Sequence, residues 1–326
     1  MFYTLNLLRR RVDGSTRTRR LIRICEGPPA EEGIEMGENL PLIEVVDEIG
    51  STNAEMKRRG REGAPHGAAL RARVQTAGRG QRTHVWASPA GGLYLSVLLR
   101  PDVSATALPA LPVACAMGAM GALREAGCPG ARLKWPNDIV VGGRKLAGVL
   151  TELAMSDEGA FAVCGIGVNI ETPELPASDG ALAPLPATGL RDALAPGASC
   201  PDLDVLADAI RDGILKFVEG WSAADRWNRK YPSPDSSAQQ TSSAEVDRWI
   251  KDPVRGGAEG PLAPLLAAYN ASLAFIGTRV RVITIEGEEL VCGLFLGVDG
   301  YGHALVSHDG GIVDTYDAVD VCIRPA

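Results

Sequence analysis

The stretch VQTAGRGQRTHVW, residues 74–86, has the composition of an anion-binding loop. It combines two arginines, Arg79 and Arg82, with a histidine and contains no acidic residue. Gly78 and Gly80 would let backbone N–H groups approach a ligand closely, and arginine guanidinium groups donate forked hydrogen bonds to oxygen anions. A solvated hairpin tip is the structural alternative, because arginine is mostly exposed in folded proteins.

This loop does not match a common nucleotide-binding motif. The sequence has no G-x-x-x-x-G-K-[ST] segment, and Thr83 stands where G-x-G-x-x-G requires its third glycine. The segment GIGVNI fails in the same way, with Ile170 at that position. The anion must therefore be inferred from other residues.

Composition restricts the class of protein. The 326 residues are 45% hydrophobic and 22% charged, which is typical of a globular chain long enough for one large and one small domain. A formal net charge of −7 argues against broad nucleic-acid binding, which requires a basic face. The seven cysteines are scattered and form no C-x-x-C pair, so we expect a reducing, cytoplasmic location without a disulfide framework or a zinc site.

The first 35 residues differ from the rest. Met1 to Cys25 contain seven arginines and one acid, Asp13. An Arg-rich, acid-poor segment is typical of a transit peptide, but a disordered tail, or an upstream start with Met36 as the initiator, fits it as well. We favour a disordered or non-native extension over residues 1–35.

Strands outnumber helices between residues 42 and 170. The patterns predict strands at 42–49, 68–74, 91–100 and 160–170, with a further strand, a short strand and a longer strand between 132 and 153, the last two joined by a Gly142-Gly143 hairpin. They also predict a helix over 51–60 with Thr52 as N-cap and Gly60 as its end, and a second helix that ends at Gly127. Hairpin connections favour a mixed α+β sheet over a doubly wound parallel one.

The remaining chain divides into three parts. Residues 202–221 form an amphipathic pattern typical of a core helix, and residues 222–260 have a Ser/Gln/Pro-rich centre that indicates a flexible insertion. Five short apolar runs from Thr278 onward, separated by EGE, DG and DGG turns, predict a small SH3-like β-barrel.

Six stretches closely resemble, in this order, the bacterial biotin protein ligases: EIGSTN, QTAGRG, WASPAGGLYLS, LKWPNDIVV, RKLAGVLTE and GIGVNI. Each is weak alone, but six in register are specific. The resemblance covers residues 42–222 and resumes near residue 262. It implies a mixed-sheet catalytic domain of the biotin/lipoate ligase type over 36–221, followed after the insertion by an SH3-like β-barrel over 261–326.

The resemblance also implies a two-step reaction. Biotin and ATP, with Mg²⁺ expected on the triphosphate, give biotinyl-5′-AMP and pyrophosphate, and the biotinyl group then passes to a lysine of the biotin carboxyl carrier protein of acetyl-CoA carboxylase. Two anions 4 Å apart repel by about 4 kcal/mol at an effective dielectric of about 20, so fixed cations are needed. By resemblance these are Arg79, Arg82 and Lys145, and the loop closes over an adenylate that water would hydrolyse.

A larger set of residues contacts biotin or the adenylate by resemblance. Asp138 would orient the acceptor lysine, which must attack as a neutral amine although its usual pKa is about 10.4. Lys134 would neutralise phosphate or simply pair with Asp138. The catalytic members are Lys145, Arg79 and Asp138, and the binding members are Ser51, Thr52, Asn53, Gln75, Gly78, Gly80, Arg82, Trp86, Lys134, Trp135, Asn137, Gly148, Gly165, Gly167 and Asn169. No residue is identified as a metal ligand. Structural alternatives are helix capping by Thr52, a core position for Trp135 and a turn role for Asp138.

The sequence departs from the family pattern G-R-G-R-x-G-R-x-W inside the loop. Gln81 takes the place of the second arginine, Thr83 that of the glycine and His84 that of the last arginine. Two fewer permanent positive charges should weaken the hold on the adenylate, unless His84 is protonated or Arg82 compensates. Slow turnover, a leaky intermediate or a changed pH profile is therefore expected.

Two other functions are compatible with these residues. A biotin or nucleotide sensor would keep the pocket but lose efficient catalysis through the loop changes. A lipoate or octanoate ligase would share the fold but should need an apolar pocket in place of Ser51, Thr52 and Asn53. We expect no DNA-repressor role, since no DNA-binding domain precedes residue 40, and a homodimer is possible.

Overall fold

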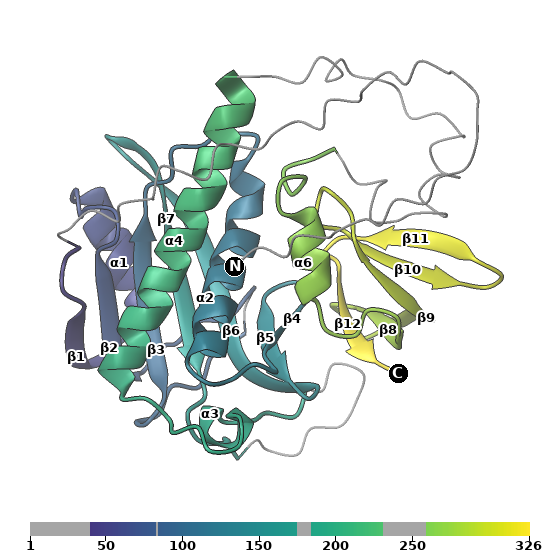
Figure 1. Ribbon diagram of the computed structural model, residues 1–326, viewed down its shortest axis with the longest axis horizontal. Helices are drawn as coiled ribbons and strands as arrows, with labels where there is room; N and C mark the ends of the chain where they lie inside the picture. Colours follow the sequence, from purple (N-terminus) through teal and green to yellow (C-terminus); the bar gives the residue numbers. More distant parts are fainter. Residues whose placement is uncertain (1–39, 83, 175–183, 231–258) are drawn as a thin grey trace, which may run out of the picture. The chain divides into compact units, whose positions relative to one another are not determined.

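The computed structural model describes residues 40–82, 84–174, 184–230 and 259–326 (Figure 1). The predicted extension over residues 1–35 lies outside this part of the chain, as does most of the predicted insertion over 222–260. The described part contains a seven-stranded sheet and a five-stranded sheet.

The seven-stranded sheet is mixed, as predicted. Its order is β1-β2-β3-β7-β6-β5-β4, in which β1 and β2 are parallel and every other neighbouring pair is antiparallel. Its strands are β1 (Glu44–Ile49), β2 (Ala69–Gln75), β3 (Leu93–Leu99), β4 (Arg132–Lys134), β5 (Asp138–Val141), β6 (Arg144–Ser156) and β7 (Gly159–Val168). The predicted β5–β6 hairpin turns on Gly142 and Gly143, which both have the positive φ that such a tight turn requires.

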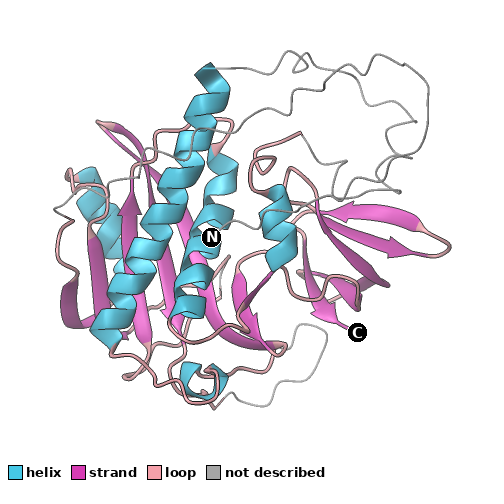
Figure 2. Cartoon of the chain, viewed as in Figure 1, coloured by secondary structure: helices cyan, strands magenta, loops and turns pink. Residues whose placement is uncertain are grey.

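Helices cover both faces of this sheet (Figure 2). They are α1 (Thr52–Arg61), the 3₁₀ turn η1 (Leu108–Ala110), α2 (Leu111–Glu125), α3 (Leu190–Ala193), α4 (Leu203–Lys230) and α6 (Leu266–Ser272). Strand β3 is buried at every position because Leu95 and Val97 pack in the cluster of α2 and α4, whereas Leu98 packs with Met56 of α1. Ser96 of β3 is thereby fully buried beside the start of α1.

Helix α4 is longer than the sequence pattern predicted. It was expected to end at Trp221 but continues to Lys230, since the chain contains no proline or glycine between Trp221 and Pro232. Ile210 and Ile214 of this helix are fully buried, which fits the predicted core position.

The start of α1 also differs by one residue from the prediction. The N-cap is Ser51, whose hydroxyl accepts a hydrogen bond from the Ala54 amide, and Thr52 is the first helical residue. Gly60 does not end the helix but lies inside it, where a Cβ would meet the Phe161 ring at 2.2 Å. The predicted cap and end were therefore wrong, because a neighbouring hydroxyl caps equally well and the glycine serves packing.

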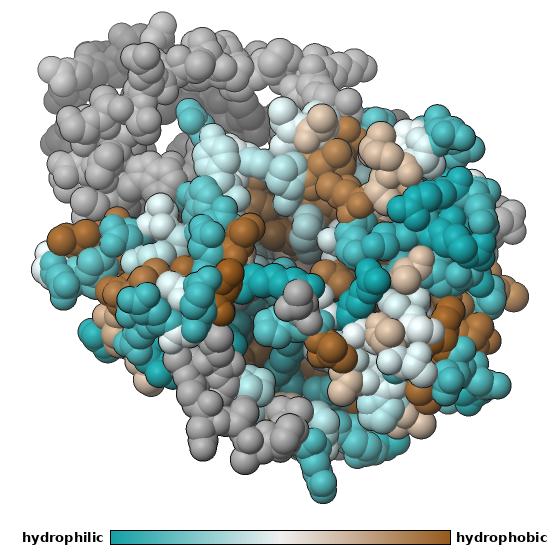
Figure 3. All heavy atoms as spheres, turned by 180° about the vertical axis from the view of Figure 1, so that it is seen from behind, coloured by the Kyte–Doolittle hydropathy of each residue, from teal (hydrophilic) through white to brown (hydrophobic). Residues whose placement is uncertain are grey.

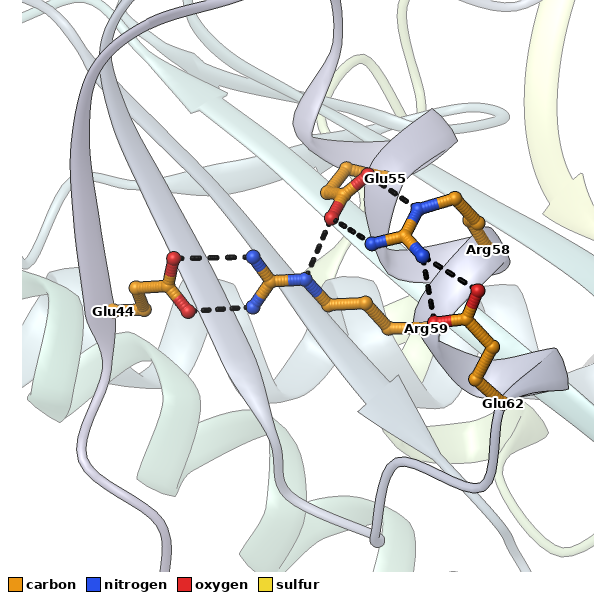
Figure 4. A network of polar contacts seen from close by, with 5 residues as sticks. All are labelled: Glu44, Glu55, Arg58, Arg59 and Glu62. Atoms are coloured by element: carbon orange, nitrogen blue, oxygen red, sulfur yellow. Dashed lines mark hydrogen bonds and ion pairs between the residues drawn. The ribbon is translucent and has the colours of Figure 1, made fainter.

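Ion pairs tie α1 to the edge strand β1 (Figure 4). Arg59 donates to Glu44 of β1 and to Glu55 one turn earlier in the helix, and Arg58 pairs with Glu55 and Glu62. The hydrogen bonds from Arg58 and then Arg59 lower the pKa of Glu55 to about 2. This network holds the helix whose first turn reaches the pocket described below.

The five-stranded sheet is antiparallel, with the order β11-β10-β9-β8-β12. Its strands are β8 (Arg279–Thr284), β9 (Glu289–Val298), β10 (Ala304–His308), β11 (Ile312–Tyr316) and β12 (Val321–Pro325), which are the five predicted ones. The sheet is not closed, so the prediction of a barrel was wrong in this respect. The turn between β11 and β12 binds Arg82 through its carbonyl groups, and the two strands do not pair across it.

Hydrogen bonds join β4 and the residue that follows it to the segment that carries the five-stranded sheet. Trp135 donates its indole N–H to the Gly302 carbonyl at 2.8 Å, and the Ala274 amide donates to the Leu133 carbonyl at 2.6 Å. Seen from behind, hydrophilic and hydrophobic residues intermingle on the surface (Figure 3). Among the described residues, no helix is both long and apolar enough to cross a bilayer.

Candidate active site

One pocket, of about 370 Å³, collects nearly all of the predicted site residues. The first turn of α1, the end of β2 and the central parts of β6 and β7 supply one end, and β4, β5 and the start of β6 supply the other. The loop after β2 and the β12 edge of the five-stranded sheet complete the wall. Of the predicted residues, only Gly78, Trp135 and Asn169 do not line it.

The first end is a closed set of neutral hydrogen-bonding groups, which we call the polar box: Thr52, Asn53, Gln75 and Ser96. Ser96 Oγ lies 2.8 Å from Thr52 Oγ1 and 2.6 Å from Asn53 Oδ1. Gln75 Oε1 accepts from the Thr52 amide at 2.8 Å and lies 3.0 Å from its hydroxyl. The box can recognise a small polar ring by shape and hydrogen bonding, without net charge.

Sequence reasoning missed Ser96, although it ends one of the quoted stretches. A hydroxyl inside the otherwise apolar strand LYLSVLL was the available signal, because a buried polar group must be hydrogen-bonded. Ser88, in the same stretch, was missed as well, and it accepts from Gln75 Nε2 at 3.0 Å.

The floor of the pocket consists of glycines on paired strands. Gly148 of β6 lies opposite Gly167 of β7, and the Trp86 ring rests on both. A Cβ at Gly167 would lie 2.3 Å from Trp86 Nε1, and one at Gly148 would lie 2.8 Å from the same ring. Gly165 gives the corresponding space to Asn53. These positions therefore must be glycine for the indole and the amide to approach the sheet.

The second end of the pocket is charged. Asp138 lies 2.7 Å from Lys145 Nζ and 3.6 Å from Lys134 Nζ. Burial raises the pKa of Asp138, but the two lysine charges outweigh it and hold that pKa below its usual value. Lys134 is 3% exposed, and burial lowers its pKa despite the neighbouring carboxylate. Lys145 also lies over the Trp86 ring, 5.1 Å from its centroid.

A third cation reaches this end from the five-stranded sheet. Arg324 of β12 lines the pocket, and its charge acts on both Lys134 and Asp138. Cys322 of the same strand lines the pocket as well. Sequence reasoning missed both residues, because nothing local shows which strand of a distant sheet faces Lys134 and Lys145.

The predicted anion-binding loop is a short hairpin. Trp86 N donates to the Gly78 carbonyl at 3.0 Å, and Gly80 N donates to the His84 carbonyl at 2.8 Å, so Gly78 holds the base of the hairpin rather than the pocket. Arg79 lines the pocket, and its charge contributes to lowering the pKa of Glu152. Thr83 lies outside the described residues, whereas Gln81 and His84 line the pocket.

Arg82 points at the five-stranded sheet. With φ of 59° in the left-handed region, it directs its guanidinium to the carbonyl groups of Ala318, Val319 and Val321. The bond to Val319 measures 3.0 Å. In this arrangement Arg82 holds the loop against the β11–β12 turn, and it would have to release these carbonyls to replace the arginine missing at Gln81.

The other predicted residues support the pocket from behind. Trp135 is 2% exposed and bonded to Gly302, which matches the core alternative. Asn169 donates to the carbonyl groups of Lys145 and Thr188 and so holds the start of β6. Asn137 lines the pocket and donates to the Val149 carbonyl at 2.8 Å.

No group of three or more His, Cys, Asp or Glu side chains in the described residues could hold a metal ion. The charged end offers one carboxylate among three cations, which suits a phosphate rather than a divalent cation.

Comparisons with known proteins agree on one family. The model of the biotin/lipoate A/B protein ligase family matches residues 47–169. The bifunctional ligase/repressor BirA of Bacillus subtilis is 36% identical over 137 residues, which span only 41% of this chain and 41% of that protein. The biotin--[acetyl-CoA-carboxylase] ligase of Mycobacterium tuberculosis is 30% identical over 300 residues, 88% of this chain and 93% of that protein.

The fold has a solved counterpart. The biotin protein ligase from Aquifex aeolicus, solved in complex with biotin and ATP, aligns with a TM-score of 0.60 at 22% identity. The alignment covers 88% of this chain and all of that one. The shared fold thus includes the five-stranded sheet.

Proposed function

The chain belongs to the biotin/lipoate A/B protein ligase family, and from this we propose that it is a biotin protein ligase. It joins biotin and ATP to biotinyl-5′-AMP and transfers the biotinyl group to a lysine of a biotin carboxyl carrier protein. The observation that carries the proposal is the division of one pocket into a neutral polar box and a triply cationic end.

This division matches the two ends of biotin. The ureido ring is neutral and carries both hydrogen-bond donors and an acceptor, whereas the other end is a carboxylate that must meet a phosphate. The polar box also favours biotin over lipoate, whose dithiolane ring would leave the buried groups of Thr52, Asn53 and Gln75 without partners.

In the first step a biotin carboxylate oxygen attacks the α-phosphorus of ATP. A C(O)O–P bond forms, and the bond from the α-phosphorus to the bridging oxygen of pyrophosphate breaks. Lys145, Lys134 and Arg324 offset the repulsion between the two anions, which is about 4 kcal/mol at 4 Å and an effective dielectric of about 20. Asp138 holds Lys145 in place before the ligand arrives.

In the second step the carrier lysine attacks the acyl carbon of the adenylate. The new C–N bond replaces the C–O bond to AMP, and the amine loses a proton. Asp138 remains ionised at neutral pH because its pKa is lowered, so it can accept a hydrogen bond from the attacking amine. Mg²⁺, when bound with ATP, would supply further charge on the phosphates.

Intact-mass spectrometry of a carrier domain tests the proposal. The domain is incubated with this protein, ATP, Mg²⁺ and biotin, and parallel samples contain lipoate or octanoate. We expect one biotinyl addition and none with the other acids. Biotin binding without addition would indicate the sensor, and addition of lipoate or octanoate would indicate the related acyl ligase.

We further propose a cytoplasmic location and regard association into a homodimer as a prediction. The six cysteines in the described part of the chain are free, which suits a reducing compartment. Cell fractionation tests the location, and sedimentation velocity tests the dimer.

A further inference from the structure

We propose that Glu152 is a positioning residue that makes the polar box a site for N–H donors. Glu152 lies on β6, behind the box, and does not line the pocket. It fixes the direction of the Asn53 side-chain amide and so determines which atom of that amide faces the ligand. The inference rests on the proposed function, in which the ligand of the box is the ureido ring of biotin.

The direction of the Asn53 amide follows from its partners. One end of the amide lies 2.9 Å from Glu152 Oε2 and 3.3 Å from the Leu150 carbonyl oxygen. Neither a carboxylate nor a backbone carbonyl carries a proton, so this end must be the NH₂ group. The oxygen Oδ1 then faces Ser96 and the open space left by Gly165.

Gln75, at the opposite side of the box, is fixed by the same logic. The hydroxyl of Ser88 donates its single proton to the Trp86 carbonyl at 2.9 Å and must accept from the Gln75 amide at 3.0 Å. The NH₂ group of Gln75 therefore points to Ser88, and Oε1 points to Thr52. Two amide oxygens thus close the box from both sides.

A proton count shows that the box lacks donors. The row Asn53 Oδ1, Ser96 Oγ, Thr52 Oγ1 and Gln75 Oε1 has successive O···O distances of 2.6, 2.8 and 3.0 Å. Three contacts share only the two hydroxyl protons of Ser96 and Thr52, since neither amide oxygen carries one. One contact therefore joins two lone pairs. The box therefore has more lone pairs than protons, so Thr52, Asn53 and Gln75, which line the pocket, can accept from the N–H groups of a ligand, and a ureido ring has two.

The carboxylate of Glu152 is itself held in place. Lys57 Nζ of α1 lies 2.5 Å from Glu152 Oε1, and the side chains of Glu152 and Lys57 are 24% and 19% exposed. Burial raises the pKa of Glu152, but the hydrogen bonds from Lys57 and Asn53 outweigh it and lower that pKa. The acceptor facing Asn53 is thus permanent at neutral pH.

The variant Glu152→Gln reverses this arrangement with almost no change in volume. Lys57 attracts the amide oxygen of the new glutamine, so the glutamine presents its NH₂ group to Asn53. Asn53 must then turn its own oxygen toward residue 152 and its NH₂ group toward the ligand, where two donors meet. We expect the Kd for biotin, measured by titration calorimetry without ATP, to rise roughly 10- to 100-fold, while the KM for ATP stays the same.

A double variant separates amide direction from lost charge. In Lys57→Met with Glu152→Gln, the ammonium group that would bind the glutamine oxygen is gone, so this oxygen can accept from Asn53 and restore tight biotin binding. Glu158→Gln, which removes an exposed carboxylate at the β6–β7 turn, is the matched control and should bind like the wild type. Thermal melting of all variants checks that they fold.

Each outcome bears on one proposal. Loss of affinity in Glu152→Gln with recovery in the double variant supports the inference. Unchanged affinity in Glu152→Gln, or a loss that the double variant does not recover, overturns it. A wild-type protein that binds no biotin contradicts the proposed function instead, whatever the variants do.

Discussion

The two ends of the pocket are built in opposite ways. At the polar box, Thr52, Asn53, Gln75 and Ser96 come from helix and strand positions, and their side-chain groups are bonded to one another or to neighbouring elements. At the charged end, three cations from two sheets surround one carboxylate. The first end is ordered without a ligand but has more acceptors than protons, and the second carries an excess of positive charge.

This difference assigns specificity and catalysis to different ends. A hydrogen-bond network whose donors and acceptors have fixed directions discriminates between ligands, because a wrong ligand leaves buried groups unpaired. An excess of cations selects little but stabilises any anion placed there, including the charge that develops in adenylate formation. Changes at the charged end should therefore alter rates, whereas changes at the polar box should alter affinity for biotin.

Lys145→Ala should have the largest effect. We expect pyrophosphate release to fall about 10²- to 10³-fold, because one fixed cation is removed from the reacting anions, while biotin affinity changes little. Lys145 is 29% exposed, so folding should tolerate the change. Lys216→Ala, the same substitution on an exposed position of α4, is the control. Unchanged pyrophosphate release in folded Lys145→Ala would contradict the assignment of catalysis to the charged end.

Asp138→Asn should rank second. Transfer from preformed biotinyl-5′-AMP should fall about 10²-fold, and the free energy of unfolding should fall by about 3 kcal/mol because Lys134 is left buried without a counter-charge. The exposed Asp157→Asn serves as the control. An equal loss in pyrophosphate release and in transfer would show that Asp138 acts only by holding Lys145.

The pH dependence follows from the lowered pKa of Asp138. A carboxyl group with a lowered pKa stabilises the fold above its usual value of 3.8 and loses that contribution as pH falls through the folded pKa. The rate of biotinyl transfer by the wild type should therefore not decrease through protonation of Asp138 at any pH above 3.8. A limb near pH 6 that disappears in Asp138→Asn would contradict this.

The succession of strands along the chain was predictable because it depends on local patterns. The alternation of apolar and polar residues and the Gly142-Gly143 pair predicted the hairpin that brings Asp138 near Lys145. The order of the six family-like stretches identified both residues as site residues. The cap of α1 was misplaced because Ser51 and Thr52 are adjacent hydroxyls with the same capping chemistry. Local sequence alone does not distinguish them.

The remaining differences depend on contacts between distant segments. Arg324 joins the lysines only because β12 borders the pocket, and the β11–β12 turn binds the loop through Arg82. Glu152 was visible within RKLAGVLTE, but its role depends on the partner that α1 places beside it. Pairing across sheets leaves no local signal.

Restoring the family pattern in the loop should have a moderate effect. The triple variant Gln81→Arg, Thr83→Gly and His84→Arg returns two permanent charges, each able to donate a charge-assisted hydrogen bond to the adenylate. We expect the release of biotinyl-5′-AMP into solution to slow about tenfold. Faster release would show that the loop already holds the adenylate by other contacts, whereas Kd for biotin should not change in either case.

Arg82→Ala should have the smallest effect. The side chain donates to the carbonyl groups of Ala318, Val319 and Val321, so its removal frees the loop from the five-stranded sheet without removing a cation from the lysine end. Exposed hydrogen bonds of this kind contribute about 1 kcal/mol, so adenylate release should quicken only a few-fold. Arg82→Lys, which keeps the charge but not the planar fork, should behave like Arg82→Ala.

The comparison of these two Arg82 variants decides what the arginine contacts during the reaction. If it serves the carbonyl groups, both variants release the adenylate faster and both form it at the wild-type rate. If it turns to the phosphate when ATP binds, the lysine variant keeps most of the activity and the alanine variant approaches the loss seen in Lys145→Ala. The second result would show that Arg82 belongs to the charged end once ATP is bound. The number of cations at that end, and with it the difference between the two ends, would then depend on the ligand.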